Sequence, residues 1–119
     1  MPRNMSFKLT TEQVRNRTKT VTRRTGWKNL TPGTILNAVV QAQGLRKGQK
    51  VEVICQIRID SNTPECLQTL IGHPEYGAEE CIKEGFPEMT PREFVNLFLR
   101  THRCFSDYDK VNRIAFSYL

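Results

Sequence analysis

Residues 50–60 alternate between apolar and polar side chains, and only Ile54 breaks the pattern. Successive side chains of a β-strand point to opposite faces of its sheet, so the alternation predicts a strand with one face against a core. A chain that carries such a strand has to supply further strands beside it. The inward positions are Val51, Val53, Cys55, Ile57 and Ile59, and the outward positions are Glu52, Gln56, Arg58 and Asp60.

Glycines at 44 and 48 bound a predicted hairpin loop before this strand, with Arg46 and Lys47 at its tip. A basic tip of this kind faces either water or a phosphate. β-branched residues favour an extended chain over residues 18–24. Apolar residues indicate two further strands, at residues 35–42 and 111–119.

The clearest helix signal begins at Thr90, which is placed to accept a capping hydrogen bond from Glu93. Pro91 stands at the first helical position, where proline needs no hydrogen-bonded N–H. Together they predict a helix over residues 91–101. Its apolar face, which we assign to the core, consists of Phe94, Leu97, Phe98 and Thr101.

Two shorter helices are predicted, one capped by Thr10 and ending near Arg17, the other over residues 78–84. Residues 61–77 contain two prolines and two glycines and are expected to be irregular, as a lid or the rim of a site. Strands and helices in this order predict an α+β fold with a small curved or barrel-like sheet and short flanking helices.

The chain has 119 residues and a formal net charge of +6, which predicts one domain spanning residues 1–119. Residues 1–59 hold twelve Lys and Arg against two acidic side chains, whereas residues 60–119 hold six against ten. The densest basic run, residues 15–28, contains no acidic residue. An anion such as the phosphate of a polynucleotide or nucleotide suits that density, and the alternative is a basic face that binds only water.

Several functional classes are disfavoured. The four cysteines, Cys55, Cys66, Cys81 and Cys104, show no Cys-x-x-Cys spacing, so we expect small buried side chains and no metal or other cofactor. The sequence also lacks the common nucleotide, metalloprotease and hydrolase motifs. No apolar run is long enough to cross a bilayer, so we expect a cytoplasmic protein that does not bind membranes.

Lys19 and Thr22 form the most chemically suggestive pair of the basic run. Neighbouring arginines lower the pKa of a lysine by like-charge repulsion, and a neutral amine is a better base for a nearby hydroxyl. Glu84, at a predicted helix end, is a candidate carboxylate partner. The other interpretation is a strand threonine and two surface charges.

Four segments together resemble an ASCH domain, a member of the PUA-like superfamily. This resemblance spans nearly the whole chain and implies a small β-barrel with a cleft and a role linked to RNA or nucleosides. The arrangement is also similar to small ASCH proteins encoded by phages and prophages. The segments are residues 17–24, Leu30-Thr31-Pro32-Gly33-Thr34, Glu84-Gly85-Phe86 followed by residues 90–94, and residues 111–118.

Lys19 and Arg24 match the family signature Gly-x-Lys-x-x-Glu-x-Arg, while Arg17 replaces its glycine and Thr22 its glutamate. A branch of the family, the N(4)-acetylcytidine amidohydrolases, has threonine at that place. By resemblance, Lys19, Thr22 and Glu84 are the candidate catalytic residues for hydrolysis of an acyl group on a cytosine nucleoside. Candidate ligand-binding residues are Arg17, Arg23, Arg24, Trp27 and Lys28.

Three hypotheses follow. The first is an amidohydrolase of a modified pyrimidine nucleoside. The second is a module that binds RNA or a modified base without turnover. The third is a phage accessory protein that binds a host protein through its acidic C-terminal half. The sequence leaves the oligomeric state open.

Overall fold

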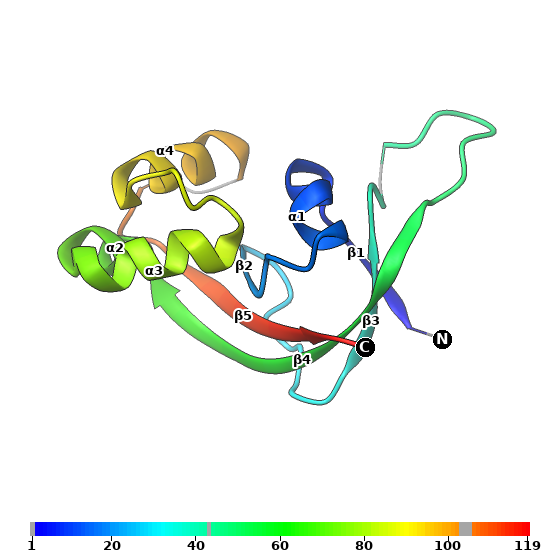
Figure 1. Ribbon diagram of the computed structural model, residues 1–119, viewed down its shortest axis with the longest axis horizontal. Coiled ribbons are helices and arrows are strands. Elements are labelled where there is room, and N and C mark those ends of the chain that lie inside the picture. The colour runs from blue at the N-terminus through cyan, green and yellow to red at the C-terminus, as the bar shows by residue number, and fades with distance from the viewer. Residues whose placement is uncertain (1, 43, 103–105) are drawn as a thin grey trace.

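The computed structural model describes residues 2–42, 44–102 and 106–119 (Figure 1). It is an α+β fold, as predicted, in which a five-stranded sheet carries short helices. The strands are β1 Arg3–Ser6, β2 Val21–Arg24, β3 Ile35–Val39, β4 Val53–Cys66 and β5 Lys110–Tyr118. The helices are the 3-10 turn η1 Lys8–Thr10, followed by α1 Thr11–Arg15, α2 Gln68–Gly72, α3 Pro74–Glu84 and α4 Pro91–Thr101.

The strand order is β1-β3-β4-β5-β2, with β1 parallel to β3 and the other pairs antiparallel. The described residues leave this sheet open, with β1 and β2 as its edges, so the barrel expected from the sequence is not formed. Each edge strand has only four residues. One side chain reaches across instead: the Arg24 guanidinium on β2 donates to the Ser6 carbonyl oxygen of β1 at 2.7 Å.

The long strand β4 contributes residues to one hydrophobic cluster and ends beside a second. Its register with β5 shifts between Ile59 and Ser61, and such a bulge bends and twists a strand. Before the bulge, Ile57 and Ile59 pack with Met5, Phe7, Leu36, Ile114 and Phe116. The second cluster, next to the end of β4, comprises Leu67, Leu70, Cys81, Phe94, Val95, Phe98 and Val111.

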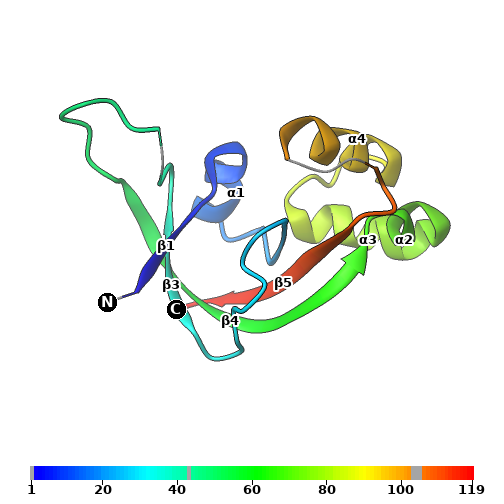
Figure 2. The ribbon, with the colours of Figure 1, turned by 180° about the vertical axis from the view of Figure 1, so that it is seen from behind.

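Helices α2, α3 and α4 gather at one end of the sheet, and α1 lies towards the other end, where both termini are found (Figures 1 and 2). The predicted helix at 91–101 is confirmed, including both hydrogen bonds of the Thr90–Glu93 capping box. Its predicted core face is only partly correct. Phe94 and Phe98 are buried, whereas Thr101 at the last turn is exposed.

Three local predictions are wrong. Residues 61–77 are not an irregular lid, because β4 continues to Cys66 and is followed by α2 and the first turn of α3. The strand predicted at 50–60 begins only at Val53, whose side chain is 52% exposed at the outer end of the hairpin. Thr10 makes no capping hydrogen bond, because it belongs to the η1 turn and is itself buried.

Of the predicted buried cysteines, Cys81 is buried and Cys55 and Cys66 are half-buried. Cys104 lies outside the described residues. In the part of the chain that the structure describes, no helix has the length and apolar character needed to cross a membrane.

Candidate active site

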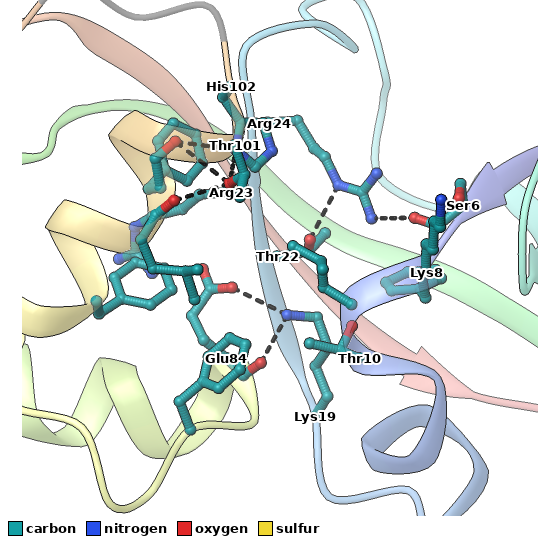
Figure 3. Close-up of a pocket in the computed structure, with 16 residues that line it drawn as sticks. Ser6, Lys8, Thr10, Lys19, Thr22, Arg23, Arg24, Glu84, Thr101 and His102 are labelled. Atoms are coloured by element: carbon teal, nitrogen blue, oxygen red, sulfur yellow. Dashed lines mark hydrogen bonds and ion pairs between the residues drawn. The ribbon is translucent and has the colours of Figure 1, made fainter. Parts of the chain in front are cut away.

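A cavity of about 310 Å³ opens between β2, the η1 turn, the end of α3 and α4 (Figure 3). We call it the site cavity. The three candidate catalytic residues, Lys19, Thr22 and Glu84, all line it. Much of the remaining lining is apolar. Its members include Phe7, Leu9, Phe86, Phe94, Leu97 and Phe98.

Lys19 and Glu84 form a buried ion pair at the floor of the site cavity. The Lys19 Nζ lies 2.9 Å from Glu84 Oε1 and 2.7 Å from the Glu84 backbone oxygen, and both residues are 3% exposed. Burial lowers the pKa of the Lys19 ammonium below its ordinary value, against the opposing charge of Glu84. Two of the three N–H bonds of the ammonium are thereby directed at one residue.

The end of α3 is fixed in place by contacts from the N-terminal segment. Gly85 ends the helix in the left-handed conformation with φ +98°, which glycine adopts without steric cost. The Gln13 side chain donates to the Gly85 carbonyl oxygen at 3.1 Å, and the Thr20 amide donates to the Lys83 carbonyl oxygen at 2.8 Å. These two bonds bring Lys19 to Glu84.

Thr22 presents a hydroxyl that is held by a guanidinium. Arg24 Nε donates to Thr22 Oγ1 at 3.0 Å, while its Nη2 holds the Ser6 carbonyl, and its guanidinium carbon lies 4.9 Å from the centre of the Phe7 ring. Burial lowers the pKa of Arg24 to about 10, which still leaves it charged at neutral pH. A fixed positive charge therefore lies beside the hydroxyl (Figure 3).

Arg23 has a different environment from the one predicted. This candidate ligand-binding residue lines the site cavity, but its side chain has no exposed surface and binds Glu84 at 2.9 Å, Glu65 at 2.7 Å and Glu80 at 2.6 Å. Burial opposes its charge, yet the carboxylates of Glu84 and Glu65 raise the pKa of Arg23 above its ordinary value. Its charge is therefore compensated inside the protein.

Three other predicted ligand-binding residues lie outside the lining of the site cavity. Arg17 is exposed and stacks over Tyr118, with its guanidinium carbon 5.4 Å from the ring centre. Trp27 packs against the first cluster beneath Arg3, in a second hollow that shares Ser6, Lys8 and Arg24 with the site cavity. Lys28 is exposed and lines neither hollow.

Sequence reasoning missed the carboxylates that surround Arg23. Glu80 is 1% exposed and is also bound by Arg113 at 2.5 Å, and Glu65 accepts a hydrogen bond from Tyr76. One signal was available: Glu80 and Glu84 are four residues apart, and such residues share a helix face. Glu65 had no comparable signal, because it follows the bulge in β4.

His102 was also missed as a lining residue. Its ring stacks on Phe98 with centroids 3.9 Å apart, and burial lowers its pKa. Among the described residues no group of three or more His, Cys, Asp or Glu side chains is arranged to hold a metal ion.

Comparison with known proteins gives no further constraint, because no family model, curated protein or solved structure matches this chain.

Proposed function

We propose that the site cavity hydrolyses the acyl-amide bond of an N(4)-acylated cytosine nucleoside, with N(4)-acetylcytidine as the simplest candidate substrate. The observation that carries the proposal is the convergence of a buried lysine, a threonine hydroxyl and a fixed guanidinium on one cavity with an apolar wall. The apolar side suits a planar base and an acyl group, and the polar side suits the bond to be broken.

In the first step, the Thr22 oxygen attacks the acyl carbon while its proton passes to the neutral amine of Lys19. The Arg24 guanidinium offsets the negative charge that develops beside it. The carbon–nitrogen bond then breaks, and the Lys19 ammonium returns the proton to the departing amino group of cytosine. Cytidine leaves, and the acyl group remains as an ester on Thr22.

In the second step, water attacks this ester. Lys19 accepts a proton from the water and passes it to the Thr22 oxygen as the ester bond breaks. The net reaction consumes one water and releases one carboxylic acid. Burial favours the neutral amine that this cycle requires, because it lowers the pKa of Lys19.

In this proposal Glu84 positions Lys19 and takes no part in proton transfer. One carboxylate oxygen accepts from Lys19 at 2.9 Å and the other from Arg23 at 2.9 Å. With both oxygens engaged, the carboxylate orients the lysine instead of meeting the substrate.

As part of the same proposal, the chain is a phage-type ASCH protein of the cytoplasm with a PUA-like fold. The bent sheet, whose two edges are linked by Arg24 and Ser6, supports an opened version of the PUA-like barrel. The favoured ligand is a modified nucleoside, since the predicted phosphate ligand Arg23 is already neutralised by carboxylates.

The test is release of acetate from N(4)-acetylcytidine, followed by proton NMR. The wild type and Thr22→Ser should release acetate, whereas Thr22→Val, which keeps the volume of the side chain, should release none. Thermal unfolding checks that both variants are folded. Failure of the folded wild type to release acetate would contradict the proposal.

Binding measurements separate the remaining alternatives. If the wild type binds N(4)-acetylcytidine without cleaving it, the non-catalytic base-binding module is correct. If it instead retains RNA with a steep loss of affinity on added salt, phosphate contacts dominate. Recovery of a discrete host protein with neither result would favour the accessory-protein hypothesis.

A further inference from the structure

Arg23 joins the Lys19–Glu84 pair to a larger set of charges. We call this set the ion network and define it as Lys19, Arg23, Arg113, Glu65, Glu80 and Glu84. Its three cations and three anions cancel, and none of these side chains is more than 19% exposed. Buried charges are tolerated when each has partners, so the composition of the ion network is balanced.

Glu84 is the point at which the ion network meets the site cavity. Its two oxygens are divided between Lys19 Nζ and Arg23 Nη1, each at 2.9 Å. Arg23 is held from behind by Glu65, which receives hydrogen bonds from its Nε at 3.1 Å and its Nη2 at 2.7 Å. Arg23 therefore cannot leave Glu84 without abandoning two other carboxylates.

The charged and titratable groups that act on Lys19 come from three directions. Glu84 lies at the end of α3, Arg23 and Arg24 belong to β2, and His102 follows α4. Among these groups Glu84 alone carries negative charge, and Arg23 is a second cation bound to it. The degree to which the Glu84 carboxylate stabilises the Lys19 ammonium thus depends on Arg23.

We propose that Arg23 is a positioning residue of this site, which shares the Glu84 carboxylate with Lys19 and so keeps the Lys19 amine available as a base. This inference rests on the proposed hydrolysis for its catalytic meaning. The division of the Glu84 carboxylate between Lys19 and Arg23 is a property of the folded protein, and its effect on Lys19 is measurable without substrate. Without Arg23, Glu84 would act as the counter-ion of Lys19 alone and hold its proton more tightly.

Two double variants with the same net charge test this proposal. Arg23→Gln with Glu65→Gln removes one cation and one anion, so the ion network stays neutral while Glu84 keeps only Lys19. The matched control, Arg113→Gln with Glu65→Gln, has the same charge change but removes an arginine that binds Glu80 and not Glu84. The readout is an NMR titration of the Lys19 side chain, assigned by its loss in Lys19→Arg.

The Arg23 double variant should raise the pKa of Lys19 by about one unit or more relative to the control. The pH dependence of acetate release should show the same shift, which costs about tenfold in rate below the pKa. Equal Lys19 titration in both doubles would overturn the proposal. If the wild type releases no acetate, the proposed hydrolysis fails, and the NMR comparison still decides whether Arg23 controls Lys19.

A single variant, Glu65→Gln, covers the case in which the Arg23 double variant does not fold. It removes a competing carboxylate from Arg23 and leaves Arg23 to act more fully on Glu84. The pKa of Lys19 should then fall relative to the wild type. An unchanged or raised pKa in the folded Glu65→Gln protein would contradict the proposal.

Discussion

Lys19 and Glu84 are 65 positions apart in the sequence, yet the ammonium of one donates to both the carboxylate and the backbone oxygen of the other. The double contact fixes the lysine relative to the end of α3 as well as to the carboxylate. The local backbone of α3 therefore determines where the amine lies in the site cavity.

Replacing Glu84 with glutamine should destabilise the protein by about 3–5 kcal/mol, because Lys19 and Arg23 would then share no buried carboxylate. Urea unfolding at pH 7 measures the loss. Glu79→Gln is the matched control, since Glu79 is exposed on the same helix and should change stability by less than about 0.5 kcal/mol. Equal stability of the two variants would contradict the structural role of Glu84.

Arg24→Lys should reduce the turnover of N(4)-acetylcytidine by about 100-fold, because a lysine ammonium cannot reproduce the planar fork that reaches both Thr22 and Ser6. Steady-state kinetics at pH 7 provide the measurement. Arg100→Lys, on the exposed side of α4, should leave turnover unchanged. Full activity of Arg24→Lys would show that the guanidinium takes no part in the reaction.

The pH dependence of stability should carry a contribution from Glu80. Burial opposes its ionisation, but hydrogen bonds from Arg113 and Arg23 lower its pKa from 4.5 to about 2. A pKa that is lower in the folded state stabilises the protein above about pH 4.5, and this contribution is lost as the pH falls towards 2. The unfolding free energy of Glu80→Gln should therefore differ most from that of the wild type at neutral pH.

The difference in unfolding free energy between the wild type and Glu80→Gln, measured with urea from pH 7 to pH 2.5, should shrink below about pH 4.5. The same difference measured for Glu79→Gln should stay near zero throughout. A Glu80 difference that does not change with pH would mean that its low pKa is not coupled to folding.

Arg17 has a φ of +60°, the left-handed conformation that glycine adopts most easily, and the proposed ASCH resemblance expects glycine at this position. Arg17→Gly should consequently be more stable than Arg17→Ala by about 1 kcal/mol, although both lose the contact with Tyr118. At Arg15, the last residue of α1, the order should reverse because alanine favours a helix. Thermal unfolding of the four variants tests both orders.

The elements predicted correctly are those whose signal is local. The helix at 91–101 follows from the cap at Thr90 and the proline after it, and β5 follows from its alternating apolar residues. Pro64 suggests a loop at residues 61–66, whereas β4 passes through it beyond the bulge. Pro74 likewise suggests a loop, although it occupies the start of α3.

The resemblance to the ASCH family suggested Lys19, Thr22 and Glu84 as one set, and all three line the same cavity. The environment of Arg23 was beyond reach of the sequence, because its partners come from β4 and α3 and depend on how these elements pack. Side chains alternate along a strand, so Arg23 and Thr22 point in different directions from β2. The density of basic residues along the chain does not indicate to which side of β2 the side chains of Thr22 and Arg23 point.

The position of β5 in the sheet bears on when the site cavity can exist during synthesis. It lies between β2 and β4, and Ile114 is the partner of Thr22 in the β2–β5 register. Until β5 has emerged from the ribosome, β2 lacks the strand with which it pairs, although Ser6, which binds Arg24, is already present. A nascent chain therefore displays its basic residues to the surroundings well before it can enclose a ligand.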